Sequence, residues 1–251
     1  MRETYIDTIK KEERKARLKN KKLFSREIDR IESVLNYEEE VLMAYFTLYN
    51  MEDRLEDKFY AMAISIIYKN INFLYSVFRL TCMGQYAAAR VGFRNVYESL
   101  IILKTISITK DKALMEDWIA GKNISLKTRI FKNIEYPNSQ AMKQLWEDLC
   151  KFCHGTIDAN QYSLEFNYNE TSANYVIIEM LLEMNYHVLE EYVADPVDKH
   201  VVDQLLDVIP VKVSFKEKRV MMSNLFEEQR KSWGEGVKEM FIDFSKVWKY
   251  K

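Results

Sequence analysis

The chain has few of the residues that interrupt helices. Its 251 residues include six glycines and three prolines, whereas leucine, isoleucine, methionine, lysine, glutamate and tyrosine are frequent. Few turns and few helix breakers favour long helices. Apolar residues make up 48% of the sequence, which is enough to build a sizeable core at this length. We therefore predict an all-α fold.

The chain also lacks an excess of either charge. Its formal net charge is −1, so it has no global basic field of the kind that marks proteins dedicated to coating nucleic acid. Any contact with nucleic acid would have to come from a local patch. The sequence contains neither a phosphate-binding glycine loop nor a Gly-x-Ser-x-Gly nucleophile elbow.

No apolar stretch has the features of a signal peptide or of a membrane span. Polar residues interrupt the most apolar stretch, residues 59–83, at Lys69, Asn70, Asn72 and Arg79. This spacing argues against a membrane-spanning helix. Because the chain has three cysteines and no export signal, we expect a reducing, cytoplasmic location without disulfides.

Two of the three cysteines lie in the run Cys150-Lys151-Phe152-Cys153-His154. This run matches the pattern that attaches a c-type haem, and it contains a Cys-x-x-Cys pair. Haem attachment takes place on exported chains, and this chain has no export signal. A redox pair places its first cysteine at a helix N-terminus, which favours thiolate, whereas this pair is predicted at a helix C-terminus.

A zinc site would need two further ligands. The remaining candidates, His187, His200 and Cys82, form no second ligand pair in the sequence. Free cysteine packs as a small hydrophobic residue, so we expect Cys150 and Cys153 to fill core space. We expect no metal and no cofactor.

Helical periodicity divides the chain into three parts. Residues 1–35 are predicted as a basic N-terminal helix or arm, with eight Lys or Arg residues from Lys10 to Lys22. This segment is either a solvated surface or a contact for RNA phosphates. Residues 36–193 are predicted as a helical bundle, and residues 194–251 as a C-terminal helical appendage.

Caps and breakers predict the helix boundaries within these parts. Asn36 with Glu39 resembles a capping box that opens a new helix, and Gly84 is expected to end the helix that begins near Glu56. Further helices are expected at residues 85–106, 111–121, 125–134, 137–154, 171–193 and 198–208, then an extended piece at 211–215 and two terminal helices opened by Ser214…Glu217 and Ser232…Glu235.

Candidate chemistry lies on the third long helix. At about 100° per residue, Arg90, Arg94, Tyr97 and Glu98 share one face of this helix, and Tyr86 lies beside it. Arginines inserted into a bundle are costly unless they are paired. The negative partner could be a phosphate or carboxylate ligand. It could also be internal, as in a pair between Arg94 and Glu98.

His154 is predicted at the last turn of its helix, directly before Gly155. A helix C-terminus favours imidazolium, which is a sufficient structural reason for a histidine there. The same position also suits acid–base chemistry beside a cleft. Lys151 is the nearest cation in the sequence.

A row of ionisable residues, Glu179, Glu183, His187 and Glu191, repeats every four positions along another predicted helix. A di-iron bundle needs Glu-x-x-His on two helices, whereas here the spacing is Glu-x-x-x-His and it occurs once. We therefore expect a solvated helix face that carries charge.

These features together resemble a known bacterial family. The residues that carry the resemblance are Gly84-x-Tyr86, Arg90, Arg94-x-x-Tyr97-Glu98, Trp118 and, at the end of a later helix, His154-Gly155. The family is of unknown function, has an R-x-x-x-E helix and a later H-G motif, and is similar to HEPN-type helical bundles. The resemblance covers roughly residues 36–190.

The resemblance implies a cytosolic helical bundle that is often a homodimer. HEPN-type proteins are frequently metal-independent ribonucleases of toxin–antitoxin or phage-defence systems, and others are inactive binding modules. In the catalytic members an arginine precedes the histidine on one helix. No arginine occurs in the residues just before His154, so Arg94 would have to meet His154 across helices.

Roles for the site residues follow from this resemblance. His154 would act as general base or acid on an RNA 2′-hydroxyl or leaving oxygen, and Arg90 and Arg94 would hold the scissile phosphate. Glu98 would orient an arginine. Tyr97 would donate a hydrogen bond to the substrate, with Tyr86 and Lys151 as further substrate contacts. The alternative is a noncatalytic helical module that binds a partner protein or nucleic acid.

Overall fold

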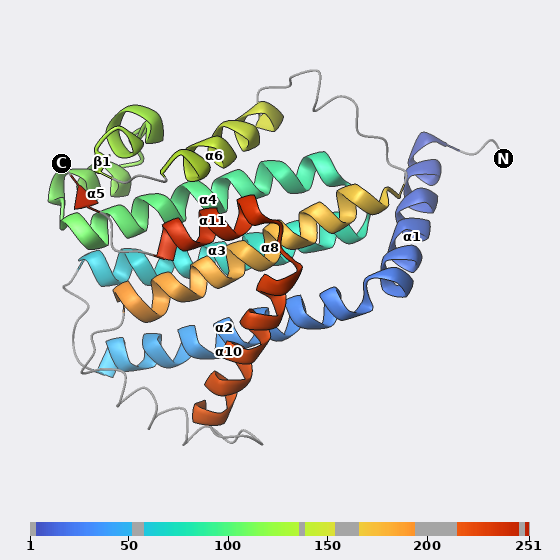
Figure 1. Cartoon of the computed structure of the whole chain (residues 1–251), viewed down its shortest axis with the longest axis horizontal. Coiled ribbons are helices and arrows are strands. Elements are labelled where there is room, and N and C mark those ends of the chain that lie inside the picture. The colour runs from blue at the N-terminus through green and yellow to red at the C-terminus, as the bar shows by residue number, and fades with distance from the viewer. Residues whose placement is uncertain are drawn as a thin grey trace.

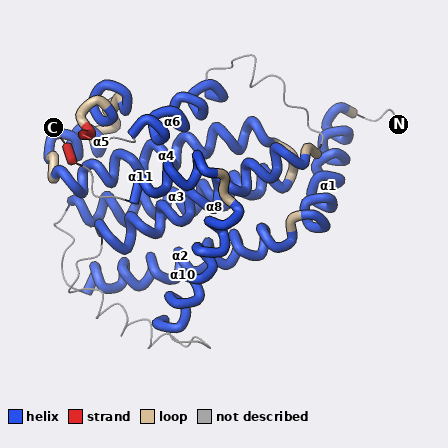
Figure 2. The backbone as a smooth tube through the Cα atoms, viewed as in Figure 1, coloured by secondary structure: helices blue, strands red, loops and turns tan. Residues whose placement is uncertain are grey.

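The computed structural model describes residues 4–51, 58–135, 139–153, 166–193, 215–245 and 249–250. Within these ranges the chain is a helical bundle (Figure 2), which confirms the predicted all-α class. The helices are α1 (Tyr5–Leu23), α2 (Ser25–Met51), α3 (Lys58–Cys82), α4 (Tyr86–Thr109), α5 (Lys112–Ile119), α6 (Ser139–Cys153), α8 (Tyr168–Val188), α10 (Phe215–Ser232) and α11 (Glu235–Ser245).

Four short elements complete the described chain. Two are π-helical turns, η2 (Leu126–Phe131) and η3 (Leu189–Val193). The other two are the two-residue strands β1 (Ile134–Glu135) and β2 (Lys249–Tyr250), which pair in antiparallel fashion.

Three long helices form the centre of the bundle. α3, α4 and α8 pack against one another, and α2 lies along α3 and α8 (Figure 1). α6 packs against α4, and α11 packs against both α6 and α8. α1 lies across one end of the bundle, where it contacts α2 and α3. The central helices are thus covered by helices from both ends of the sequence.

The turn between α3 and α4 follows the glycine predicted to end α3. Gly84 has φ of +79°, in the left-handed region that favours glycine. Its amide donates to the Thr81 carbonyl at 3.0 Å, and the Gln85 amide donates to the Leu80 carbonyl at 2.9 Å. These bonds satisfy the last carbonyls of α3, which confirms the predicted helix end.

The helix start predicted at Asn36 is wrong. α2 runs without a break from Ser25 to Met51, so it continues from the predicted N-terminal part into the predicted bundle. Its buried face includes Val34 and Val41, one on each side of Asn36. Because this face packs on α3 and α8 on both sides of Asn36, tertiary packing outweighs the local capping signal.

The row of ionisable residues that begins at Glu179 is not, over its first two members, the solvated face that its spacing suggested. Glu179 is 1% exposed and Glu183 is 5% exposed. Arg30 of α2 donates to Glu179 at 2.8 Å, and Arg230 of α10 is ion-paired with Glu183. Periodicity shows that residues share a helix face, but it does not show that arginines distant in sequence cover that face.

A buried chain of hydrogen bonds joins four helices. Ser99 of α4 donates to Asn70 of α3 at 2.7 Å, and Asn70 donates to Asn185 of α8 at 3.2 Å. Asn185 in turn donates to Glu38 of α2 at 3.0 Å. All four residues are buried. Burial raises the pKa of Glu38 well above its usual range, and the hydrogen bond from Asn185 partly opposes that rise.

The C-terminal helices complete the core. Trp233, Phe241 and Phe244 are buried, and the Trp233 indole donates to Glu179 of α8 at 3.4 Å. The Phe244 ring covers the ammonium group of Lys104 from α4, with the nitrogen 4.5 Å from the ring centroid. The predicted short helix at 198–208 lies outside the described residues, as does the extended piece except for Phe215, which begins α10.

By length and composition, α3 alone among the helices of the described ranges could cross a membrane. Of its apolar window, 44% is buried inside the bundle. A core helix of a soluble protein has the same properties, so this finding is weak evidence for a membrane span.

Gly92 provides the first test of this packing, because α3 and α4 approach each other closely there. A Cβ added at Gly92 would lie 2.2 Å from Cγ1 of Val77. We predict that Gly92→Ala lowers the free energy of unfolding by about 1–3 kcal/mol, measured by urea denaturation. Gly236→Ala is the control, because a Cβ there meets nothing within 4 Å. Equal effects of the two substitutions would contradict the close approach.

Lys104 provides a second test. Burial lowers its pKa to about 7, and Glu191 only partly opposes this effect. Below pH 7 Lys104 is charged in both the folded and the unfolded chain, so folding buries a charge. Above about pH 10.5 Lys104 is neutral in both states, so folding buries no charge. The cost of burying Lys104 therefore decreases as pH rises from 7 to 10.5.

We predict that Lys104→Met stabilises the protein by on the order of 3 kcal/mol at pH 6 and by much less at pH 10. Thermal unfolding followed by circular dichroism at the two pH values measures this difference. The exposed Lys112 gives the control, Lys112→Met. A stabilisation that is the same at both pH values would contradict a lowered pKa of Lys104 in the folded chain.

Candidate functional site

The predicted catalytic residues Arg94 and Glu98 lie where α4 packs against α6. Arg94 Nε donates to Glu98 Oε1 at 2.8 Å, and the indole nitrogen of Trp146, on α6, donates to the same oxygen at 2.8 Å. The side chains of Arg94 and Glu98 are 25% and 30% exposed. Glu98 therefore holds Arg94 in position and is itself held by α6, while both groups keep contact with solvent.

Arg94 also reaches the C-terminal end of α6. Burial lowers the pKa of Arg94, but side-chain hydrogen bonds with Cys153 and Glu98 outweigh it and raise the pKa above its ordinary value. Burial raises the pKa of the Cys150 thiol, and Arg94 opposes that rise. The guanidinium is thus charged and Cys150 is protonated at neutral pH.

His154 lies outside the described residues. It is the residue that follows Cys153 in the sequence. The structure thus brings Arg94 to the last described residue before His154, and the contact between the two predicted catalytic residues stays a prediction.

Arg90 is held by α8 instead of α6. Its Nε donates to Oδ1 of Asn174 at 3.2 Å, and its guanidinium forms an ion pair with Glu170. The side chain is 13% exposed. The two arginines lie one turn apart on α4 but are directed to different neighbouring helices, and they do not form one shared phosphate clamp in this arrangement.

The two predicted tyrosine contacts are buried in the bundle. Tyr86 is 1% exposed, and its hydroxyl lies 2.9 Å from Oγ1 of Thr171 and accepts from the Asn167 amide at 3.0 Å. Tyr97 is fully buried, and its hydroxyl donates to the Met142 carbonyl at 2.8 Å. Both tyrosines join α4 to its neighbours, and a substrate would reach them only if the helices separated.

Lys151, the remaining predicted contact, is half exposed on α6. Its ammonium group pairs with Asp148, one turn earlier, at 2.7 Å. This pair is a surface interaction of small energy, so it holds Lys151 only weakly.

Lys69 of α3 belongs to the same region, although it was not among the predicted site residues. Its ammonium donates to Oδ1 of Asn95 at 3.1 Å. Burial lowers the pKa of Lys69, and the negative charge of Glu98 opposes that effect. In the sequence Lys69 is only a polar interruption of an apolar stretch, so no pattern signals its approach to α4.

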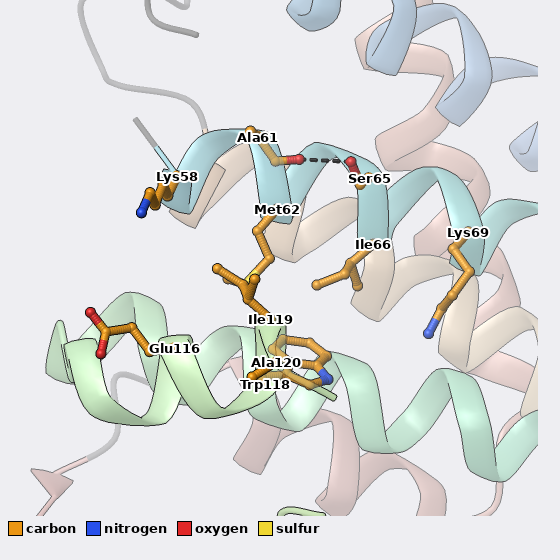
Figure 3. A pocket seen from close by; sticks show the side chains of 10 residues that line it. All are labelled: Lys58, Ala61, Met62, Ser65, Ile66, Lys69, Glu116, Trp118, Ile119 and Ala120. Atoms are coloured by element: carbon orange, nitrogen blue, oxygen red, sulfur yellow. Dashed lines mark hydrogen bonds between the residues drawn. The ribbon is translucent and has the colours of Figure 1, made fainter. Parts of the chain in front are cut away.

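Lys69 also lines a groove of about 770 Å³ between α3 and the end of α5 (Figure 3). Met62 and Ile66 of α3 face Trp118 and Ile119 across it. A concave, mostly apolar surface of this volume is typical of ligand-binding sites. Lys69 thus lines this groove and is also close enough to Glu98 for the charge of Glu98 to act on it.

Within the described part of the chain, no three His, Cys, Asp or Glu side chains converge to hold a metal ion. Searches against protein-family models, curated proteins and solved structures each returned no match.

Tyr97→Phe tests whether the Tyr97 hydroxyl is a structural group. We predict a loss of about 0.5–1.5 kcal/mol in the free energy of unfolding, because the bond to the Met142 carbonyl is removed from a buried site. Urea denaturation measures this loss. Tyr68→Phe, at a half-exposed position on α3, is the control and should change stability little. No loss in Tyr97→Phe would show that the hydroxyl does not stabilise the fold.

Proposed function

We propose that this HEPN-like helical protein is a metal-independent endoribonuclease of a bacterial defence or toxin–antitoxin system. Its site would consist of Arg94, Glu98 and His154. The observation that supports this proposal best is the position of Arg94, which Glu98 orients and whose pKa is raised by interaction with Cys153, the residue before His154.

Arg94 has the properties that a phosphate-binding group needs. A guanidinium stays charged and presents several donors in a fixed plane, which suits a phosphate. Here Glu98 fixes the plane of the guanidinium, and Trp146 fixes Glu98. A donor that is oriented before the substrate arrives stabilises developing charge without paying for reorganisation during the reaction.

His154 would supply the proton transfers. As a general base it would remove the proton from the ribose 2′-hydroxyl, whose oxygen then attacks the adjacent phosphorus atom. The bond from phosphorus to the 5′-oxygen breaks, and a protonated group delivers a proton to that leaving oxygen. Because the attacking group is the 2′-hydroxyl, DNA would not be cleaved.

The basic helix α1 would supply affinity for RNA. All eight Lys and Arg residues from Lys10 to Lys22 are exposed. α1 is anchored to the bundle, because Asn20 donates to the Cys82 carbonyl at 3.1 Å and accepts from Tyr175 at 2.8 Å. A fixed row of exposed cations attracts phosphates regardless of base sequence.

A second candidate is a noncatalytic module that binds a partner protein or nucleic acid. The observation in its favour is that Arg90 and Arg94 are both engaged in internal ion pairs. The homodimer and the cytoplasmic location that the resemblance implies stay predictions for either candidate.

Cleavage of a labelled single-stranded RNA by the full chain in excess EDTA tests the first candidate. We predict that His154→Ala and Arg94→Gln each lower the cleavage rate by about 100-fold or more, because each removes a group that acts in the transition state. Arg26→Gln, at an exposed position on α2, is the control and should keep full activity.

Two results would contradict this first candidate. One is cleavage that survives in His154→Ala. The other is a folded wild-type chain that does not cleave the RNA. If that chain binds the RNA, or binds a protein captured in a pull-down, the noncatalytic module is favoured. Thermal unfolding of each variant separates loss of activity from loss of fold.

A further inference from the structure

The groove between α3 and α5 carries its charged residues at its two ends. Lys58 of α3 and Glu116 of α5 lie at one end, and Lys69 of α3 lies at the other (Figure 3). Lys58 and Lys69 are eleven positions apart, which corresponds to about 16 Å of helix. The charges at the first end are of opposite sign, whereas the charge at the second end is positive. The groove is therefore polarised along its length.

Between its ends the groove offers mostly apolar contacts. Apolar side chains of α3 and α5 line this part, namely Met62, Ile66, Trp118 and Ile119. The Ser65 hydroxyl, which also lines the groove, already donates to the Ala61 carbonyl at 2.8 Å. Ile119 is 53% exposed, and exposed apolar surface that is gathered in one place often marks a binding site. The middle of a ligand in this groove should be apolar.

Lys69 is a cation that the described residues neutralise only in part. Its ammonium group donates to the neutral amide of Asn95 at 3.1 Å and lies 5.8 Å from the ring centroid of Phe73. Glu98 is the carboxylate whose charge acts on Lys69, but its Oε1 accepts from Arg94 at 2.8 Å. Within the described ranges no ion pair joins Lys69 to a carboxylate. A carboxylate that enters the groove would therefore oppose the effect of burial on Lys69.

An apolar chain that ends in a carboxylate matches this distribution of groups. The carboxylate would meet Lys69, and the chain would lie along the face of α3 that carries Met62 and Ile66, where burial of its methylene groups drives binding. A nucleotide fits less well, because its polar base edges would lie in the apolar part of the groove, where few partners would satisfy them.

We propose that this groove binds a free, medium-chain monocarboxylate, with Lys69 pairing with the carboxylate and the side chains between α3 and α5 covering the alkyl chain. Charge complementarity with Lys69 sets the direction of the ligand in the groove. This inference does not depend on the ribonuclease proposal.

Isothermal titration calorimetry of the full chain with decanoate tests the proposal. We expect saturable binding with one site per chain, at least tenfold weaker in Lys69→Gln because a charge-assisted bond is lost. Lys112→Gln is the control and should bind normally, because it alters an exposed residue of α5 that does not line the groove.

Two further ligands separate the contributions of the head group and the chain. Decanol has the same chain without the charge, and hexanoate has the same head group with a shorter chain. Each should bind the wild-type chain at least tenfold more weakly than decanoate. Equal binding of decanol and decanoate, or decanoate binding that is unchanged in a folded Lys69→Gln, would overturn the proposal.

A second variant covers the case in which Lys69→Gln does not fold. Ser65 is exposed and lines the groove, so Ser65→Trp fills the space from the surface and should abolish decanoate binding. Binding that is unchanged in Ser65→Trp, or no binding by the wild-type chain, would contradict the proposal. So would a wild-type dimer in sedimentation velocity that Ser65→Trp converts to a monomer and decanoate does not, because the groove would then be covered by a second copy.

Discussion

The arrangement of the bundle depends on the polar residues that α8 carries into the core. A helix buried on all sides by apolar residues could rotate or slide at little cost, whereas each buried polar group needs a particular partner. Along α8 these partners come from different helices. Tyr175 donates to Asn20 of α1, Glu179 accepts from Arg30 of α2, and Asn185 accepts from Asn70 of α3. One helix thus sets the position of three others.

The candidate site depends on this arrangement through α4. On one side, Arg90 and Tyr86 fix α4 to the beginning of α8. On the other side, the hydroxyl of Tyr97 and the carboxylate of Glu98 fix it to α6. Arg94 lies between these attachments, so its guanidinium is directed toward the end of α6 by contacts that are mostly structural. Tyr86, Arg90 and Tyr97, which were predicted to contact a substrate, thus attach α4 to its neighbours on either side of Arg94.

Much of the fold could be predicted because local signals decide it. Gly84, which has positive φ, and the cap Asp111 act within one turn of chain, and the structure has both at helix ends. The helix expected from residue 171 begins earlier, at Tyr168, because Asn167 caps it. The capping signal at Asn36 did not start a helix, because α2 packs against the core on both sides of this residue.

What could not be predicted was the pairing of residues far apart in sequence. Arg30 and Glu179 are separated by 149 positions, so the periodicity that placed Glu179 on one face of α8 carried no information about the arginine covering it. The approach of Lys69 to α4 likewise could not be predicted, because no sequence pattern joins two helices in this way. The predicted contact of His154 is untested, because His154 lies outside the described residues.

A double-mutant cycle on Arg30 and Glu179 tests most directly whether buried polar pairs of α8 fix the bundle. The free energy of unfolding is measured in urea for Arg30→Met, Glu179→Met and the double variant. Each single substitution should cost about 3–5 kcal/mol, because it leaves an uncompensated buried charge, and the double variant should cost much less than the sum. Costs that add to within about 0.5 kcal/mol would contradict this account.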